Sequence, residues 1–207
     1  MSDTDEVDGR SRRAARKRAE RRRKVLDTAL GVFSEKGYHQ TRVTDIIDAA
    51  QISRGTFYLY FDSKNAIFHE ILDQLLAEIR ANMVGVDLEP GAPPVRDQLF
   101  ASVRRILRMF RQNPGLTRVV LREAVGLDEE VDRKLRAFYV SLHAWLVESL
   151  QNGQTMGFIR PLDPDPVAWC ILGSVKELLE RMVEDEGAEE RLALVVMDYN
   201  LQGILAG

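Results

Sequence analysis

Residues 52–68, ISRGTFYLYFDSKNAIF, bring together side chains that could bind a polyanion. Arg54 and Lys64 carry positive charges, and Thr56 and Tyr58 offer hydroxyl groups. These are the groups that proteins use to contact phosphate oxygens and the edges of bases. The stretch also contains five aromatic residues. It is therefore either a helix that only fills a core, or a helix whose buried face anchors it while its exposed face contacts nucleic acid.

The spacing within this stretch favours the second interpretation. Ser53 is a suitable N-cap for a short helix that begins at Arg54. Phe57 and Phe61 lie four residues apart, so they share one helix face, which we expect to be buried. Gly55 has no side chain, and we expect the backbone to approach DNA there. The residues predicted to point outward are Arg54, Thr56, Tyr58 and Tyr60.

Apolar periodicity predicts helices along the whole chain, and alternating β-branched patterns are absent. We therefore predict an all-α fold with about nine helices. The first three, joined by tight turns, have the proportions of a helix-turn-helix unit, in which the second helix of the pair enters the major groove. The expected helices cover about residues 21–36, 42–50, 54–60, 64–82, 95–111, 115–125, 128–151, 166–186 and 188–205.

Charge is unevenly distributed along the 207 residues. Residues 1–66 contain 14 Lys and Arg against 10 Asp and Glu, whereas residues 67–207 contain 15 against 22. Ten of the basic residues lie within 10–24, where Glu20 is the one acid. A basic front and an acidic remainder suggest a polyanion-binding head on a body with another task. The basic run is either a solvated tail or an arm that contacts DNA.

Several functional classes find no support in the sequence. Cys170 is the single cysteine, so an intrachain disulfide and a cysteine-based metal site are excluded. The three histidines, 39, 69 and 143, belong to no metal-binding or catalytic motif. We expect no enzyme activity, no cofactor and no metal. The sequence has no signal-peptide pattern and no apolar run of membrane-spanning length, so we expect a cytoplasmic protein without a membrane partner.

Residues 37–72 resemble the DNA-binding signature of the TetR family of bacterial transcriptional regulators. The resemblance rests on Gly37-Tyr38, Thr41, Ile46-Ile47, Gly55-Thr56-Phe57-Tyr58, Phe61 and Lys64. Two positions depart from the family pattern: Ile47 replaces a usual Ala, and Tyr60 a frequent His or Arg. The resemblance implies that the DNA contacts are made by Arg42, Thr44, Ser53, Arg54, Gly55, Thr56, Tyr58, Tyr60 and Lys64. Among these, Arg54 is the best candidate for hydrogen bonding to a guanine.

The resemblance also implies how the chain is divided. We predict a disordered acidic tail and basic arm over 1–20, a helix-turn-helix domain over 21–66, and a helical effector-binding and dimerisation domain over 67–207. Its last two helices, about 166–205, are expected to form a homodimer that binds a palindromic double-stranded DNA operator. Residues expected to line a pocket for a small hydrophobic effector are Phe110, Leu121, Phe138, Leu142, Trp145 and Trp169.

Two functions stay open at this point. The family resemblance favours a repressor that an effector releases from DNA. The alternative is a nucleoid-associated DNA-binding protein of the same fold, which acts through a protein partner and has no small-molecule effector. A fully packed C-terminal domain would favour the alternative, because an effector needs a cavity to occupy.

Overall fold

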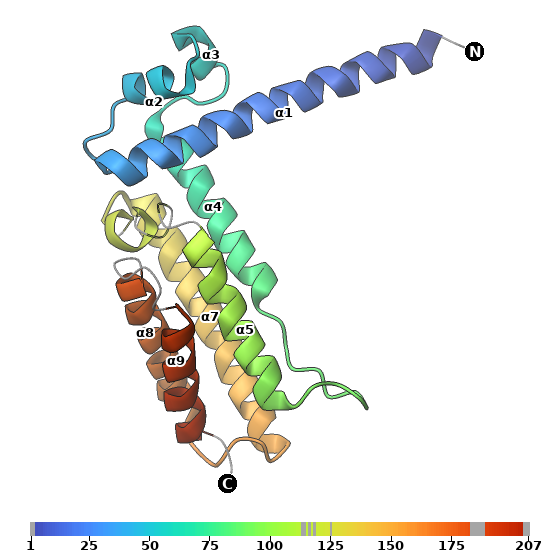
Figure 1. Cartoon of the computed structure of the whole chain (residues 1–207), viewed down its shortest axis with the longest axis vertical. Helices are drawn as coiled ribbons and strands as arrows, with labels where there is room; N and C mark the ends of the chain where they lie inside the picture. The colour runs from blue at the N-terminus through green and yellow to red at the C-terminus, as the bar shows by residue number, and fades with distance from the viewer. Residues whose placement is uncertain are drawn as a thin grey trace. The chain divides into compact units, whose positions relative to one another are not determined.

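The computed structural model describes residues 3–112, 115, 117, 119–124, 126–182 and 189–204. Within these ranges the chain forms helices and no strand, which confirms the predicted all-α fold (Figure 1). The elements are α1 (Asp3–Lys36), α2 (Val43–Ala50), α3 (Arg54–Tyr58), α4 (Lys64–Asn82), α5 (Val95–Gln112), the π-helix η1 (Val119–Glu123), α7 (Glu129–Thr155), α8 (Pro164–Met182) and α9 (Glu189–Ile204). None of the described helices is long and apolar enough to cross a membrane.

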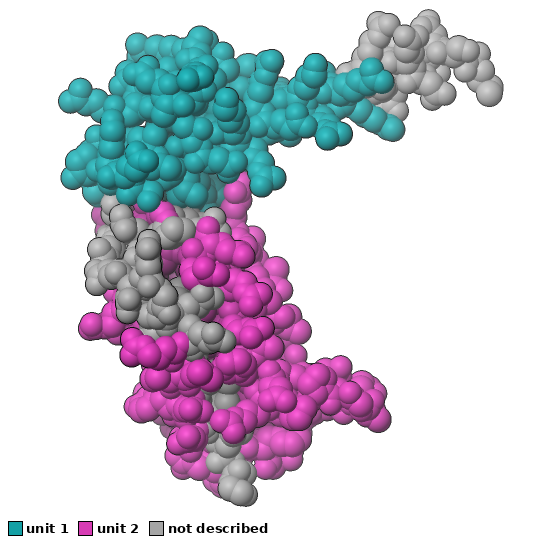
Figure 2. Space-filling view, viewed as in Figure 1, with its two compact units in different colours: residues 1–73 teal, residues 74–207 magenta. Residues whose placement is uncertain are grey.

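The chain divides into two compact units, residues 1–73 and 74–207 (Figure 2). The sequence placed this boundary earlier, after residue 66. Helix α4 contributes to both units, because it begins at Lys64 and ends at Asn82. The first unit contains the predicted helix-turn-helix, and the second contains the remaining helices.

Helix α1 begins much earlier than the sequence predicted. We expected disorder over residues 1–20, but the helix runs from Asp3. Arg, Lys, Ala and Glu dominate residues 10–24, and these residue types have high helix propensity. Ion pairs four residues apart add a small stabilisation: Arg16 Nε lies 2.9 Å from Glu20 Oε1, and Arg23 Nε lies 3.8 Å from Asp27 Oδ2.

The core of the first unit is aromatic. Phe33, Phe57 and Phe68 are fully buried, and Tyr38 is 5% exposed. The Tyr38 ring lies 5.2 Å from Phe33 and 5.0 Å from Phe68, measured between centroids. Helix α1 ends at Lys36 because Gly37 adopts φ +84, a left-handed conformation that terminates helices and that glycine adopts without strain. The turn after Gly37 brings Tyr38 into this cluster.

In the second unit, α7 packs against α8 and α5 packs against α9. The chain leaves α7 through a tight turn that contains Gly157 and follows Gly153. Gly157 adopts φ +77, and a Cβ at Gly153 would lie 2.6 Å from Ile159 Cδ1. Arg160 follows this turn, and its Nε donates to the Gly203 carbonyl at 2.7 Å. The turn thereby fixes the end of α7 close to the end of α9.

Candidate nucleic-acid interface and effector cavity

The short helix α3 has one buried face and one exposed face. Ser53 caps it, because its Oγ accepts a hydrogen bond from the Thr56 amide at 3.0 Å. Phe57 is 0% exposed and Phe61 is 3% exposed. Arg54 is exposed, and Tyr58 keeps 45% of its surface exposed. The buried face predicted for Phe57 and Phe61 is present, and of the residues predicted to point outward Arg54 and Tyr58 are exposed.

The remaining predicted contact residues of α3 differ in their exposure. Gly55 is exposed, and a Cβ there would come no closer than 3.9 Å to another atom, Ser53 Oγ. Packing inside the chain therefore does not require a glycine at this position. Thr56 is half-buried, and its hydroxyl bonds that of Ser53 at 2.8 Å. Tyr60 is also half-buried.

The start of α2 is held by a network centred on Asp45. One carboxylate oxygen of Asp45 accepts from the Arg42 amide at 2.7 Å, and the other accepts from Lys36 Nζ at 3.0 Å. These bonds, first that of the Arg42 amide, lower the pKa of Asp45 below its ordinary value of 3.8. The network ties the end of α1 to the start of α2, while the side chains of Arg42 and Thr44 stay exposed.

Lys64 has a structural environment that the sequence did not indicate. Its Nζ donates to the carbonyl oxygens of Tyr38 at 2.7 Å, Thr41 at 2.8 Å and His39 at 3.3 Å. The ammonium group also lies 4.4 Å from the centroid of the Tyr38 ring. Lys64 therefore joins α4 to the turn between α1 and α2. Contact of Lys64 with a phosphate stays a prediction.

Arg22 was not singled out by the sequence, which included it in the basic run. Its two terminal nitrogens bond both carboxylate oxygens of Glu70 in α4. Its guanidinium carbon lies 4.6 Å from the centroid of Phe61, the residue that anchors the end of the α3 segment. Arg22 thus links α1, α4 and the base of α3. The signal in the sequence was weak, because one arginine among ten basic residues shows no distinguishing pattern.

The part of α1 that precedes this contact carries exposed positive charge. Arg12, Arg13, Lys17 and Arg18 are all exposed. Arg16 is exposed too, but Glu20 neutralises it. On a regular helix these residues follow one another around the axis, so the basic arm presents charge on several sides.

The second unit contains an apolar cavity of about 510 Å³. Its walls come from α4, the segment 83–88, α5, η1, α7, α8 and α9. Size and lining are those of small-molecule sites. Of the six residues predicted to line a pocket, those in the wall are Phe110, Leu121, Phe138, Leu142 and Trp145.

Trp169, the sixth, is not part of the wall, and this prediction is corrected. Its neighbour Ala168 is fully buried, which turns Trp169 to the outer side of α8, where it is 47% exposed. The indole stacks on the His143 ring, with 4.4 Å between ring centroids. His143 Nε2 lies 3.0 Å from the Asp165 carbonyl oxygen, so these residues join α7 to the start of α8.

The polar residues in the cavity wall were missed by the sequence analysis. Two of them, Tyr139 of α7 and Lys176 of α8, have shifted pKa values, and the others are Asn82, Ser102, Ser149, Asn152 and Asn200. Burial raises the pKa of the Tyr139 hydroxyl, and the hydrogen bond from Lys176 to Glu180 raises the pKa of Lys176. At neutral pH the wall therefore presents a protonated phenol beside an ammonium group. The available signal was a lysine that interrupts the apolar run 166–183.

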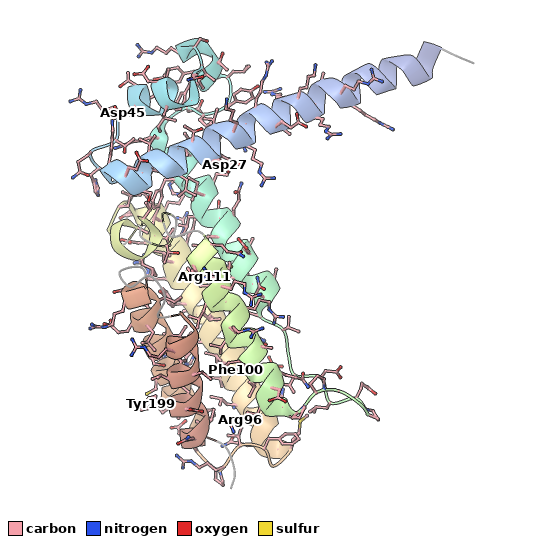
Figure 3. All side chains as sticks on the ribbon, viewed as in Figure 1. Asp27, Asp45, Arg96, Phe100, Arg111 and Tyr199 are labelled. Atoms are coloured by element: carbon pink, nitrogen blue, oxygen red, sulfur yellow. The ribbon has the colours of Figure 1, made fainter. Side chains whose placement is uncertain are left out.

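The last two helices expose a group of apolar residues. On α9, Leu194, Val195 and Tyr199 are 48%, 53% and 76% exposed. Tyr199 is labelled in Figure 3. Gly173 on α8 is exposed as well, and adds no side chain that would hinder a close approach. By contrast, Ile171 of α8 lies in the cavity wall. Exposed apolar groups of this kind are typical of protein interfaces.

Comparison with known proteins finds matches over both units. Residues 25–71 match the family model described as bacterial regulatory proteins, tetR family, and residues 92–180 match a tetracyclin repressor-like C-terminal domain. The HTH-type transcriptional repressor DhaR of Mycobacterium sp. (strain GP1) is 30% identical over 171 residues, which cover 81% of this chain and 85% of DhaR.

Two further similar proteins are named for fatty acid metabolism. The fatty acid metabolism regulator protein of Bacillus subtilis (strain 168) is 25% identical over 184 residues, which cover 87% of this chain and 93% of that protein. The solved structure of the fatty acid degradation regulator FadR from Bacillus halodurans is 26% identical and aligns with a TM-score of 0.71. That alignment covers 88% of this chain and 95% of the FadR chain.

Proposed function

Because the chain belongs to the TetR family of bacterial transcriptional regulators, we propose that it binds a palindromic operator as a dimer, represses transcription there and is released by a small hydrophobic effector. The observation that carries the proposal is the environment of α3. Arg54 and Tyr58 are exposed directly above the buried rings of Phe57 and Phe61. A helix held in this way can offer its polar face to the major groove without losing its packing.

Arg54 is the residue that we assign to base recognition. It is exposed, and among the described residues its one recorded partner is the Tyr58 ring, 5.8 Å from its guanidinium carbon. A guanidinium group with free N–H donors can bond O6 and N7 of guanine together, which is worth about 1–3 kcal/mol of discrimination. Arg42, Thr44, Ser53, Thr56, Tyr58 and Tyr60 supply the surrounding phosphate and base contacts.

The basic arm of α1 adds affinity that does not depend on sequence. Arg12, Arg13 and Lys17 are exposed and lie outside the core of the first unit. Each phosphate that such a residue neutralises steepens the dependence of log K on log salt by about 0.9. Replacing these three residues with glutamine should flatten the slope while preserving operator preference. An unchanged slope would assign the arm no DNA contact.

Dimerisation is assigned to the exposed apolar residues of α8 and α9. A symmetric contact between two copies places two recognition helices on two half-sites of a palindrome. Tyr199→Glu and Val195→Glu should shift the protein from dimer to monomer in analytical ultracentrifugation. Val140→Glu is the matched control, because Val140 is 64% exposed on α7, outside this surface. A dimer that survives both α9 substitutions would place the interface elsewhere.

The cavity supports an effector rather than the alternative function without one. A fully packed second unit would offer no space for a ligand, whereas this unit encloses about 510 Å³. Along α7 the wall extends from Leu135 to Met156, which corresponds to about 30 Å at a rise of 1.5 Å per residue. A long, apolar space fits a long-chain acyl compound, and the two relatives named for fatty acid metabolism point to the same class.

Helix α4 is the element through which the effector is proposed to act. Leu75, Leu76 and Ile79 of α4 line the cavity, and the same helix begins in the first unit. An effector that prefers one position of α4 shifts the population of the dimer toward that position. The shift changes the spacing of the two recognition helices, which must match half-sites about 34–36 Å apart.

Selection from a random DNA pool, followed by fluorescence anisotropy, tests the function. We expect enrichment of two inverted half-sites whose centres are about 10–10.5 base pairs apart. Hexadecanoate or hexadecanoyl-coenzyme A should then weaken binding of the selected DNA. The absence of any enriched site would refute the DNA-binding proposal, and ligand binding without a change in DNA affinity would refute the proposed action of α4.

A further inference from the structure

The polar residues in the cavity wall differ in whether their donors are already occupied. Asn82 Nδ2 donates to the Glu78 carbonyl at 2.8 Å, Ser149 Oγ donates to the Trp145 carbonyl at 2.8 Å, and Asn200 Nδ2 donates to the Val196 carbonyl at 2.9 Å. These side chains are bonded to their own helices. They behave as part of the wall and have little to offer a ligand.

Tyr139 and Lys176 are different. Within the described part of the chain, no hydrogen bond occupies the Tyr139 hydroxyl, although the residue is half-buried in the cavity wall. Lys176 Nζ donates to Glu180 Oε1, and an ammonium group has three N–H donors, so two remain. The raised pKa values of both residues keep these donors protonated at neutral pH. A partly buried donor without an acceptor is costly, and a ligand oxygen would remove that cost.

The position of this pair within the cavity also matters. Tyr139 is one turn from Leu135, at one end of the α7 wall, and the wall continues for about 25 Å to Met156 at 1.5 Å per residue. The wall along the remaining length is dominated by apolar side chains. The cavity therefore has Tyr139 near one end and mainly apolar surface along the rest of the α7 wall, where Ser149 and Asn152 are the polar exceptions. This distribution matches an amphiphile better than a uniformly apolar molecule.

We propose that Tyr139 and Lys176 form the head-group site of the cavity, and that the effector is a long-chain acyl compound whose terminal carboxylate or acyl carbonyl oxygen accepts hydrogen bonds from these two side chains. The inference rests on the proposed acyl effector and adds the polarity and position of its head group. A free carboxylate and a thioester share the acyl oxygen. They differ in charge, so Lys176 contributes more to binding of the carboxylate, whereas Tyr139 contributes to both.

Isothermal titration calorimetry of the full chain tests this inference with four probes of equal chain length: hexadecanoate, methyl hexadecanoate, hexadecanoyl-coenzyme A and hexadecanol. The wild-type protein should bind hexadecanoate or the thioester at least about tenfold more tightly than hexadecanol, since hydrogen bonds to charged groups are individually worth that much. Tyr139→Phe should reduce the preference for the acyl compound about tenfold and leave hexadecanol binding unchanged.

Lys176→Gln distinguishes the two sources of the acyl group. If the free acid is the effector, this substitution should weaken hexadecanoate binding about tenfold or more and affect the methyl ester little. If the thioester is the effector, Tyr139→Phe should weaken its binding more than Lys176→Gln does. Lys134→Gln is the matched control, because Lys134 pairs with Glu130 on α7 and lies outside the cavity wall.

The outcomes of these titrations separate the head-group site from the hydrophobic effector and from DNA binding. The head-group site would be overturned if hexadecanoate, the thioester and hexadecanol bound equally well. It would also be overturned if the preference for the acyl compound survived both Tyr139→Phe and Lys176→Gln. In either case the proposal of a hydrophobic effector would stand. Binding of none of the four probes would overturn the acyl effector and the head-group site together, while DNA binding would stand on its own assay. Thermal unfolding of each variant, followed by circular dichroism, verifies that the fold is retained.

Discussion

Phe57 and Tyr58 are adjacent aromatic residues of α3, one buried and one exposed. Replacing each of them with alanine tests separately what the helix contributes to the stability of the fold and to DNA affinity. Phe57 is 0% exposed, whereas Tyr58 is 45% exposed. Removing a fully buried phenyl ring costs about 3–5 kcal/mol, which is a large share of the stability of a typical domain, about 5–15 kcal/mol. About half of the Tyr58 ring stays in water, so Tyr58→Ala should cost about 1 kcal/mol.

DNA affinity should respond differently. If Tyr58 makes one hydrogen bond in each half-site, Tyr58→Ala removes about 1–3 kcal/mol from a dimer–operator complex, which is roughly 5- to 150-fold in affinity. Phe57→Ala should also weaken operator binding, because it destabilises the first unit, although Phe57 lies on the buried face of α3. Phe57→Leu keeps most of the volume, costs about 1.5 kcal/mol or less, and should preserve binding.

Urea unfolding gives the free energy of unfolding of each variant, and fluorescence anisotropy gives its operator affinity. Ligand titration of the second unit reports whether the effect of Phe57→Ala is confined to the first unit. Equal destabilisation by Tyr58→Ala and Phe57→Ala would contradict the different environments of the two rings. Unchanged operator affinity of Tyr58→Ala would assign the Tyr58 side chain no role in recognition.

Three more substitutions test the supports of this unit. Arg22→Met should lower stability by about 1 kcal/mol, because it removes the partly exposed ion pair with Glu70. A double-mutant cycle with Glu70→Gln, measured by urea unfolding, gives the coupling energy of the pair, and zero coupling would show that the pair does not stabilise the unit. Lys64→Met should lower the free energy of unfolding by about 1.5–3 kcal/mol in the same assay, because it removes the hydrogen bonds to backbone carbonyl groups. If stability is unchanged and the salt dependence of DNA binding becomes flatter, Lys64 is instead a phosphate contact. Because the pKa of Asp45 is lowered, its carboxylate stabilises the fold at neutral pH, and this stabilisation is lost as pH falls through that pKa. Urea unfolding over a pH series should therefore show a smaller loss of stability at acidic pH for Asp45→Asn than for the wild type.

The all-α fold and the two faces of α3 could be predicted from the sequence because both depend on local spacing. Two phenyl rings four residues apart must share a helix face, and the cap at Ser53 sets where that face begins. Arg54 and Tyr58 point away from this face and are exposed, whereas the half-burial of Thr56 and Tyr60 depends on their neighbours. The start of α1 was predicted too late, because helix propensity and ion pairs extended a helix that was inferred from apolar residues alone.

The cavity and its polar wall depended on tertiary structure. An apolar stripe indicates that a helix face is buried, but it does not say whether the facing helices close upon each other or leave a space. Phe110 and Phe138 were candidates for either outcome, and only the packing of α5, α7, α8 and α9 decided that they border a cavity. Trp169 was assigned to the wrong side of α8 for the same reason.

By itself, the sequence determined the helical fold, the family and the buried face of α3, since these follow from residue types at fixed separations along one chain segment. Tertiary structure decided the partners of polar side chains. Lys64 donates to carbonyl groups of residues far earlier in the chain, and Arg22 pairs with Glu70. Tyr139 and Lys176 line the same cavity from two helices. The strength and direction of such contacts depend on distances in space, which the order of residues does not contain.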